Sequence, residues 1–95
     1  MKNYPKQKFY EAVSALIGNS SIEMRLTYAA EPLLMLQPNE LPEKMRHEFE
    51  LLLNDLRQKS LSRETQIMPR PVTKEEARKL AERILGMYTE LMGGL

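Results

Sequence analysis

The segment from Pro42 to Lys59 has the sequence of an amphipathic helix that needs a covering surface. Its apolar residues follow one another at intervals of 4, 3, 1 and 3 positions: Met45, Phe49, Leu52, Leu53 and Leu56. This spacing places them on one side of an α-helix. Pro42 suits the first helical position, where no backbone N–H is required. Because one helix cannot bury its own apolar side, the rest of the chain must supply the surface that covers it.

Three further segments carry apolar residues at helical spacing, and they span about 5–17, 21–36 and 74–92. Such helices gain most of their stability from the packing of their apolar sides. A chain of 95 residues has room for one core. We therefore predict an all-α fold, a compact bundle of four helices that forms a single domain over 1–95, with residues 42–59 as the third helix.

The helix ends carry recognisable signals. Ser20 and Glu23 have the spacing of a capping box, and so do Thr73 and Glu76. Gly18 predicts a left-handed stop after the first helix. These residues predict where the second and fourth helices begin and where the first one ends.

Pro32 interrupts the second predicted helix. Proline removes the hydrogen bond to the carbonyl of Tyr28 and crowds that turn. The sequence leaves two alternatives, a kink in one helix or a break with Pro32 opening a short new helix. A bend of this kind either serves packing or lines a small cleft, and Tyr28 and Glu31 are the candidate residues of that cleft.

Residues 60–72 are predicted to form an extended arm. The sequence Pro69-Arg70-Pro71 favours polyproline-like geometry, and the segment is longer than the roughly 2–8 residues that usually join two helices. The arm either crosses the bundle and covers one end of the core, or presents Ile67, Met68 and Arg70 to a partner.

The composition argues against a metal site, a cofactor site or a catalytic centre. There is no cysteine, so disulfides, thiolate nucleophiles and zinc fingers are excluded. Lys44 stands three residues before His47, the one histidine, so the Glu-x-x-His pattern of di-iron bundles is absent. The sequence holds no glycine-rich phosphate loop. We expect no metal, no cofactor and no catalytic residue, and a solvated surface position for His47.

Charge and hydropathy bear on the partners and the location. The net charge of +1 is spread evenly along the chain, whereas nucleic-acid binders concentrate basic residues on one face. The longest apolar runs, such as Leu33–Leu36, are far shorter than the ~20 residues that span a bilayer. The first residues lack the long apolar core of a secretory signal. We expect a cytoplasmic protein that binds neither nucleic acid nor membrane.

Seven methionines are unusual for this length. Met45, Met87 and Met92 fall on the predicted core stripes, while Met24 lies one turn off the apolar line of its helix. Methionine also builds adaptable binding surfaces. Met24 is therefore a candidate interface residue, and so is Leu51, which widens the apolar arc of the third helix.

A set of leucine positions and helix caps resembles small uncharacterised bacterial all-helical proteins. The matching residues are Arg25-Leu26, Leu33-Leu34, Leu36, Glu40-Leu41-Pro42, Arg46, Phe49, Leu52, Glu76-Ala77, Leu80-Ala81 and Ile84. The resemblance covers most of the chain and implies a bacterial, cytoplasmic source. It implies no activity.

Three functions are compatible with these observations. The first is a non-enzymatic protein–protein interaction or regulatory module that self-associates or binds another protein. The second is a helix-turn-helix DNA-binding regulator, although the helix after the tightest turn is rich in acidic residues. The third is a small enzyme that uses carboxylates, with Tyr28, Glu31 and His47 as its parts. We rank them in that order.

Overall fold

The computed structural model describes residues 4–58 and 73–93. Within these residues the chain forms four α-helices and one short 3₁₀ helix, namely α1 (Tyr4–Leu16), α2 (Ile22–Leu33), η1 (Pro38–Glu40), α3 (Glu43–Gln58) and α4 (Lys74–Leu91). The predicted all-α bundle of four helices is confirmed. The arm predicted at 60–72 lies outside the described residues.

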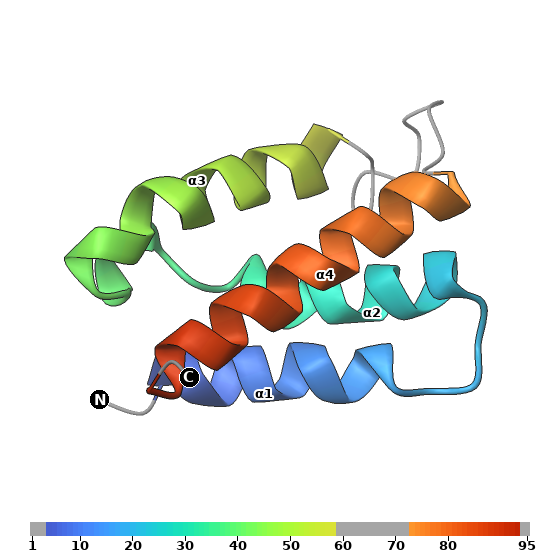
Figure 1. Cartoon of the computed structure of the whole chain (residues 1–95), viewed down its shortest axis with the longest axis horizontal. Coiled ribbons are helices and arrows are strands. Elements are labelled where there is room, and N and C mark those ends of the chain that lie inside the picture. The colour runs from blue at the N-terminus through green and yellow to red at the C-terminus, as the bar shows by residue number, and fades with distance from the viewer. Residues whose placement is uncertain (1–3, 59–72, 94–95) are drawn as a thin grey trace.

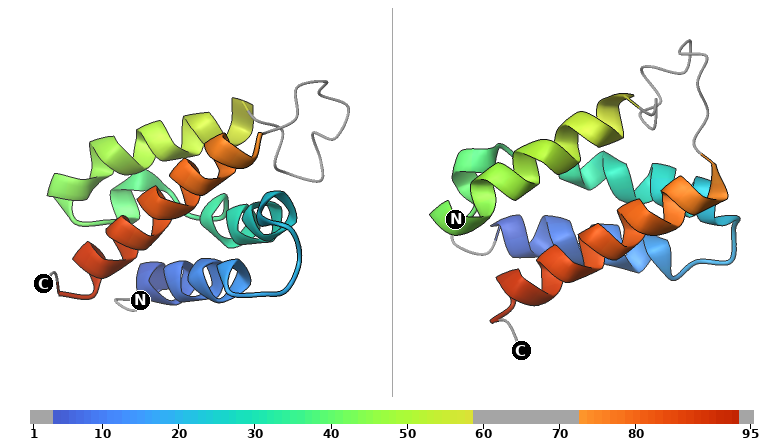
Figure 2. Two further views of the ribbon diagram at one scale, coloured as in Figure 1. Left: turned by 45° about the vertical axis from the view of Figure 1, so that its right-hand side comes forward. Right: turned by 45° about the horizontal axis from the view of Figure 1, so that its top comes forward.

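The helices form two layers (Figure 1). α1 and α2 lie side by side and run in opposite directions. α4 runs back across this pair, so that its C-terminal end lies beside the N-terminal end of α1 (Figure 2). In the view of Figure 1, α4 crosses between α3 and α1, and behind it Phe49 of α3 reaches Phe9 of α1. The crossing of α1 and α4 is the part of the fold that positions the surface described below.

One apolar core takes side chains from all four helices. Phe9 of α1 and Phe49 of α3 meet at its centre, with ring centroids 5.8 Å apart and planes tilted by 52°. No polar or charged residue is buried in the part of the chain that the structure describes. The apolar stripe predicted for the third helix is fully buried: Met45, Phe49, Leu52, Leu53 and Leu56.

The α1–α2 connection differs from the prediction in two details. Gly18 does not adopt the left-handed conformation that we expected. Instead, the N–H groups of Ile17 and Gly18 donate to carbonyls three residues back, at 3.2 and 3.3 Å, and so close α1. The Arg25 guanidinium also donates to the Leu16 carbonyl at 2.9 Å, which suits a cation at a helix C-terminus. The side chain that caps α2 belongs to Ser21, not Ser20, and accepts from the Met24 N–H at 3.2 Å.

α2 ends earlier than the predicted residue 36. It passes through Pro32 and stops one residue later, at Leu33. The following N–H groups, of Met35 and Leu36, bond to the carbonyls of Pro32 and Leu33, three residues back. Pro32 therefore lies in the last turn of α2, and the helix passes it, since the Leu34 N–H still bonds to the Ala30 carbonyl at 2.9 Å. The N–H that proline lacks leaves only the Tyr28 carbonyl without its helical bond.

The capping box at the start of α4 is confirmed. The Thr73 hydroxyl accepts from the Glu76 N–H at 3.1 Å, and the Glu76 carboxylate accepts from the Thr73 N–H at 3.1 Å. The prediction that follows is that Thr73→Ala lowers the free energy of unfolding by about 1 kcal/mol. Urea denaturation of the full chain measures it, with Thr89→Ala as the control. The Thr89 hydroxyl donates only to a carbonyl of its own helix, so we expect that control to change stability by less than about 0.5 kcal/mol.

Gly86 occupies an exposed position inside α4. A Cβ added there meets nothing within 4 Å, so no close helix approach requires glycine. We expect Gly86→Ala to raise the free energy of unfolding by about 0.5–1 kcal/mol, because alanine restricts the unfolded chain and favours the helix. Gly93 is the matched control, since its φ of 126° is left-handed and alanine there is strained. A thermal melt in which Gly86→Ala is the less stable of the two variants would contradict this prediction.

Candidate interaction surface

The exposed large apolar side chains gather mainly on two surfaces. One lies along the crossing of α1 and α4 and includes Tyr10, Leu85 and Met92, which are 60%, 45% and 52% exposed. The other follows the outer side of α2. Contiguous exposed apolar patches mark interaction sites more often than scattered apolar residues do. These two surfaces are therefore the first places to look for a partner.

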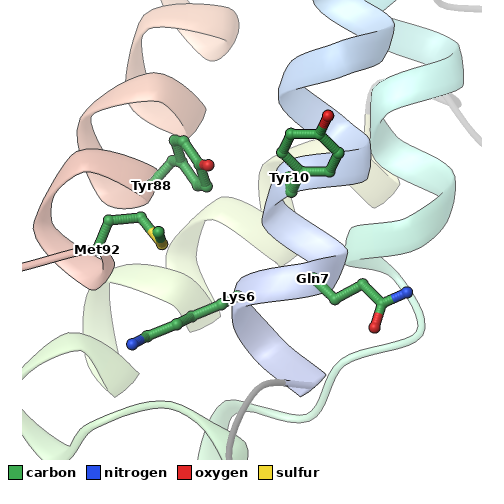
Figure 3. A pocket seen from close by; sticks show the side chains of 5 residues that line it. All are labelled: Lys6, Gln7, Tyr10, Tyr88 and Met92. Atoms are coloured by element: carbon green, nitrogen blue, oxygen red, sulfur yellow. The ribbon is translucent and has the colours of Figure 1, made fainter.

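The α1–α4 groove, as we call the first surface, is lined by Lys6, Gln7, Tyr10, Tyr88 and Met92. It is shallow and open, with a volume of about 420 Å³. Tyr10 projects from α1 toward the side where Tyr88 and Met92 project from α4, and Lys6 extends along the edge of the groove toward α4 (Figure 3). Leu85 lies one turn before Tyr88 on the same side of α4. The groove thus has an apolar floor with aromatic rings and one positive charge at its rim.

A second cavity of about 490 Å³ lies at the end of the bundle where α1 begins and α4 ends. Lys6 lines this cavity as well as the groove. The other polar groups here serve the local fold, because Arg46 donates to the Leu41 carbonyl at 2.9 Å and Glu40 accepts from the Gln37 N–H at 2.7 Å. The cavity residues are Pro5, Lys6, Asn39, Glu40, Leu41, Pro42, Arg46 and Leu91.

The α2 stripe, as we call the second surface, comprises Met24, Tyr28 and Met35. All three are exposed. Met24 and Tyr28 are four residues apart and lie on one side of α2, and Met35 lies in the turn that follows the helix. Glu31 lies beside them and is half-buried. Tyr28 and Glu31 thus occupy one side of an unbroken helical turn, and neither lines the two cavities described above. The predicted cleft residues are brought together, but on the outer surface of α2.

Leu51 lies half-exposed on the outer face of α3. Its neighbours three and four positions away are all polar, namely His47, Glu48, Asn54 and Asp55. Asp55 accepts from Arg83 of α4 at 2.6 Å, so part of this face is occupied by an ion pair. Leu51 has no exposed apolar neighbour on its own helix to extend it into a patch. The other predicted interface residues, Ile67, Met68 and Arg70, lie outside the described residues.

The groove was not predicted because Met92 was expected in the core. Met45 and Met87 are buried as expected, but Met92 is not. Ile17 is 74% exposed because α1 ends one residue before it. Adjacent apolar pairs were the available signal: Phe9-Tyr10, Ile84-Leu85, Met87-Tyr88 and Leu91-Met92. Two adjacent residues of a helix point about 100° apart, so a flat contact cannot bury both.

Among residues 4–58 and 73–93, no group of three or more histidine, cysteine, aspartate or glutamate side chains is placed to hold a metal ion. His47 lies on the exposed side of α3 and Tyr28 on the exposed side of α2. In the same described ranges, every helix is too short or too polar to cross a lipid bilayer.

Comparison with known protein families, curated proteins and solved structures finds no match to this chain. The proposals below therefore rest on the geometry and chemistry of its own residues.

Proposed function

We propose that the chain is a small protein–protein interaction module without enzymatic activity, and that it acts by self-association. The observation that carries this proposal is the clustering of exposed tyrosine, leucine and methionine side chains beside the α1–α4 groove and along α2. Tyrosine and methionine are enriched at protein interfaces. Apolar side chains of this size gain free energy when a partner removes them from water.

The size of the chain supports the same proposal. A domain of about 95 residues buries a smaller fraction of its unfolded surface than a larger one does, so its stability margin is narrow. Association with a second copy stabilises the folded state by mass action. The proposed module is a cytoplasmic protein of bacterial source.

A DNA-binding function has less support from the exposed side chains. The helix after the tight turn is α3, and its exposed charged residues are of both signs, with Glu43, Glu48 and Glu50 beside Lys44, Arg46 and Arg57. A recognition helix in the major groove faces phosphates on both sides, which repel carboxylates.

Sedimentation equilibrium of the full chain over a wide range of concentrations tests the proposal. We expect the apparent mass to rise from that of one chain, 11.1 kDa, toward a multiple of it. A mass that stays at one chain up to millimolar concentration would contradict self-association.

A further inference from the structure

We infer that the α1–α4 groove is the contact surface of a symmetric dimer, in which the groove of one copy covers the groove of a second copy. This inference rests on the proposed self-association and adds to it a surface, an orientation and an ionic contact. The twofold axis lies in the interface and perpendicular to α4, so the two α4 helices run in opposite directions. Such isologous contacts are the commonest way in which identical chains associate.

The groove has the composition of an interface centre. Tyr10 from α1 and Leu85, Tyr88 and Met92 from α4 supply apolar area, and no carboxylate lines the groove. The polar lining residues, Lys6 and Gln7, stand on one side of this apolar area. A surface with an apolar centre and polar groups at its edge matches the anatomy of stable protein interfaces.

The exposed apolar area of the groove is a substantial part of the area that a dimer interface requires. Large side chains of this kind present about 150–250 Å² each. Tyr10, Leu85 and Met92 are about half-exposed and Tyr88 is half-buried, so the four would together remove roughly 300–400 Å² per copy from water. A standard interface buries about 800 Å² per partner. The groove therefore supplies up to about half of such an interface, namely its apolar centre.

Charge complementarity favours a second copy as the occupant. We place the twofold axis at the height of α4 between Leu85 and Tyr88. Met92 of one copy then lies at the same height along the helix as the turn that contains Glu82 in the second copy. Lys6 extends beside Met92 (Figure 3), so it comes level with Glu82 of the second copy. Within the part of the chain that the structure describes, neither Lys6 nor Glu82 forms an ion pair. The dimer thus brings these two opposite charges to the same level along α4, and long-range attraction between them favours this orientation.

The other exposed apolar positions are weaker candidates. Met24 and Tyr28 lie on one side of a single helix and Met35 lies in the turn after it, whereas the groove combines side chains of two helices. Leu51 stands among polar residues. A symmetric contact through the α2 stripe or through Leu51 would bury less apolar area. It would also remove more polar groups from water, which costs free energy.

The test measures the dimer dissociation constant by sedimentation equilibrium for four single variants of the full chain. Tyr10→Glu and Met92→Glu place a carboxylate in the apolar centre, and we expect each to raise the dissociation constant at least about ten-fold, a cost of roughly 1.4 kcal/mol. Met24→Glu and Leu51→Glu are the matched controls, because those side chains are also about half-exposed. We expect the controls to stay within about two-fold of the unsubstituted chain. Far-UV circular dichroism confirms that each variant is folded, and Met92→Glu carries the test if Tyr10→Glu does not fold.

A charge exchange tests the orientation. Lys6→Glu and Glu82→Lys should each raise the dissociation constant about two- to five-fold, and the double variant should restore it, as expected for an exposed ion pair. Failure of the double variant to restore association would overturn the proposed orientation.

The outcomes separate this inference from the proposed function. If the unsubstituted chain is a monomer at every concentration, both fail. If it is a dimer that Met24→Glu or Leu51→Glu dissociates while Tyr10→Glu and Met92→Glu do not, self-association stands and the groove is wrong.

Discussion

Replacing Phe49 by alanine is expected to lower the free energy of unfolding by about 3–5 kcal/mol. The Phe49 ring is fully buried and contacts the Phe9 ring at a centroid distance of 5.8 Å. Alanine would remove the ring and leave a cavity between α3 and α1. Since domains of this size are stable by only about 5–15 kcal/mol, the variant would lose a large part of its stability. Urea denaturation of the full chain, followed by circular dichroism, measures the loss.

The neighbouring exposed residue supplies the control for Phe49. Glu50→Ala changes the same helix one position away, where the side chain is in water, and we expect it to change stability by less than about 0.5 kcal/mol. A loss below about 1 kcal/mol for Phe49→Ala would mean that α3 does not pack on α1 through this ring.

Replacing Leu26 by alanine should cost about 2–5 kcal/mol. Leu26 is fully buried on the inner side of α2, close to the buried alanines Ala29 and Ala30. Protein interiors are close-packed, so we expect that the neighbouring helices cannot readily move to fill the space that the missing isobutyl group of Leu26 leaves. The same denaturation measurement gives this value.

Met24 provides a matched control on the same helix. Methionine and leucine have similar helix propensities, but Met24 is exposed. Met24→Ala should therefore change stability by less than about 0.5 kcal/mol. Equal losses for Leu26→Ala and Met24→Ala would contradict the orientation of α2 that the structure shows.

The helices and most of the core follow directly from the sequence. The stripe from Met45 to Leu56 and the Thr73–Glu76 capping box depend on local spacing, and local spacing is visible in a single chain. The end of α2 was misplaced because Leu36 is buried although it lies beyond the helix. Leu36 lies three residues after Leu33, which is the spacing that one more helical turn would give. The sequence alone therefore does not distinguish a buried residue in a turn from a continued helix.

The candidate surface was harder to predict because it depends on which neighbour each helix meets. Tyr10 and Met92 are apolar like their core neighbours, and only the crossing of α1 over α4 determines that they stay in water. The sequence alone makes Leu51 a candidate interface residue, because it widens the apolar arc of α3. Its polar surroundings were readable from the sequence, since His47, Glu48 and Asp55 stand at helical spacing around it.

NMR spectra of the full chain recorded at a series of protein concentrations test the central claim most directly. Self-association through the α1–α4 groove predicts concentration-dependent shifts for Tyr10, Leu85, Tyr88 and Met92, with little change at Met24 and Leu51. Spectra that do not change with concentration, or changes confined to Met24 and Leu51, would contradict it.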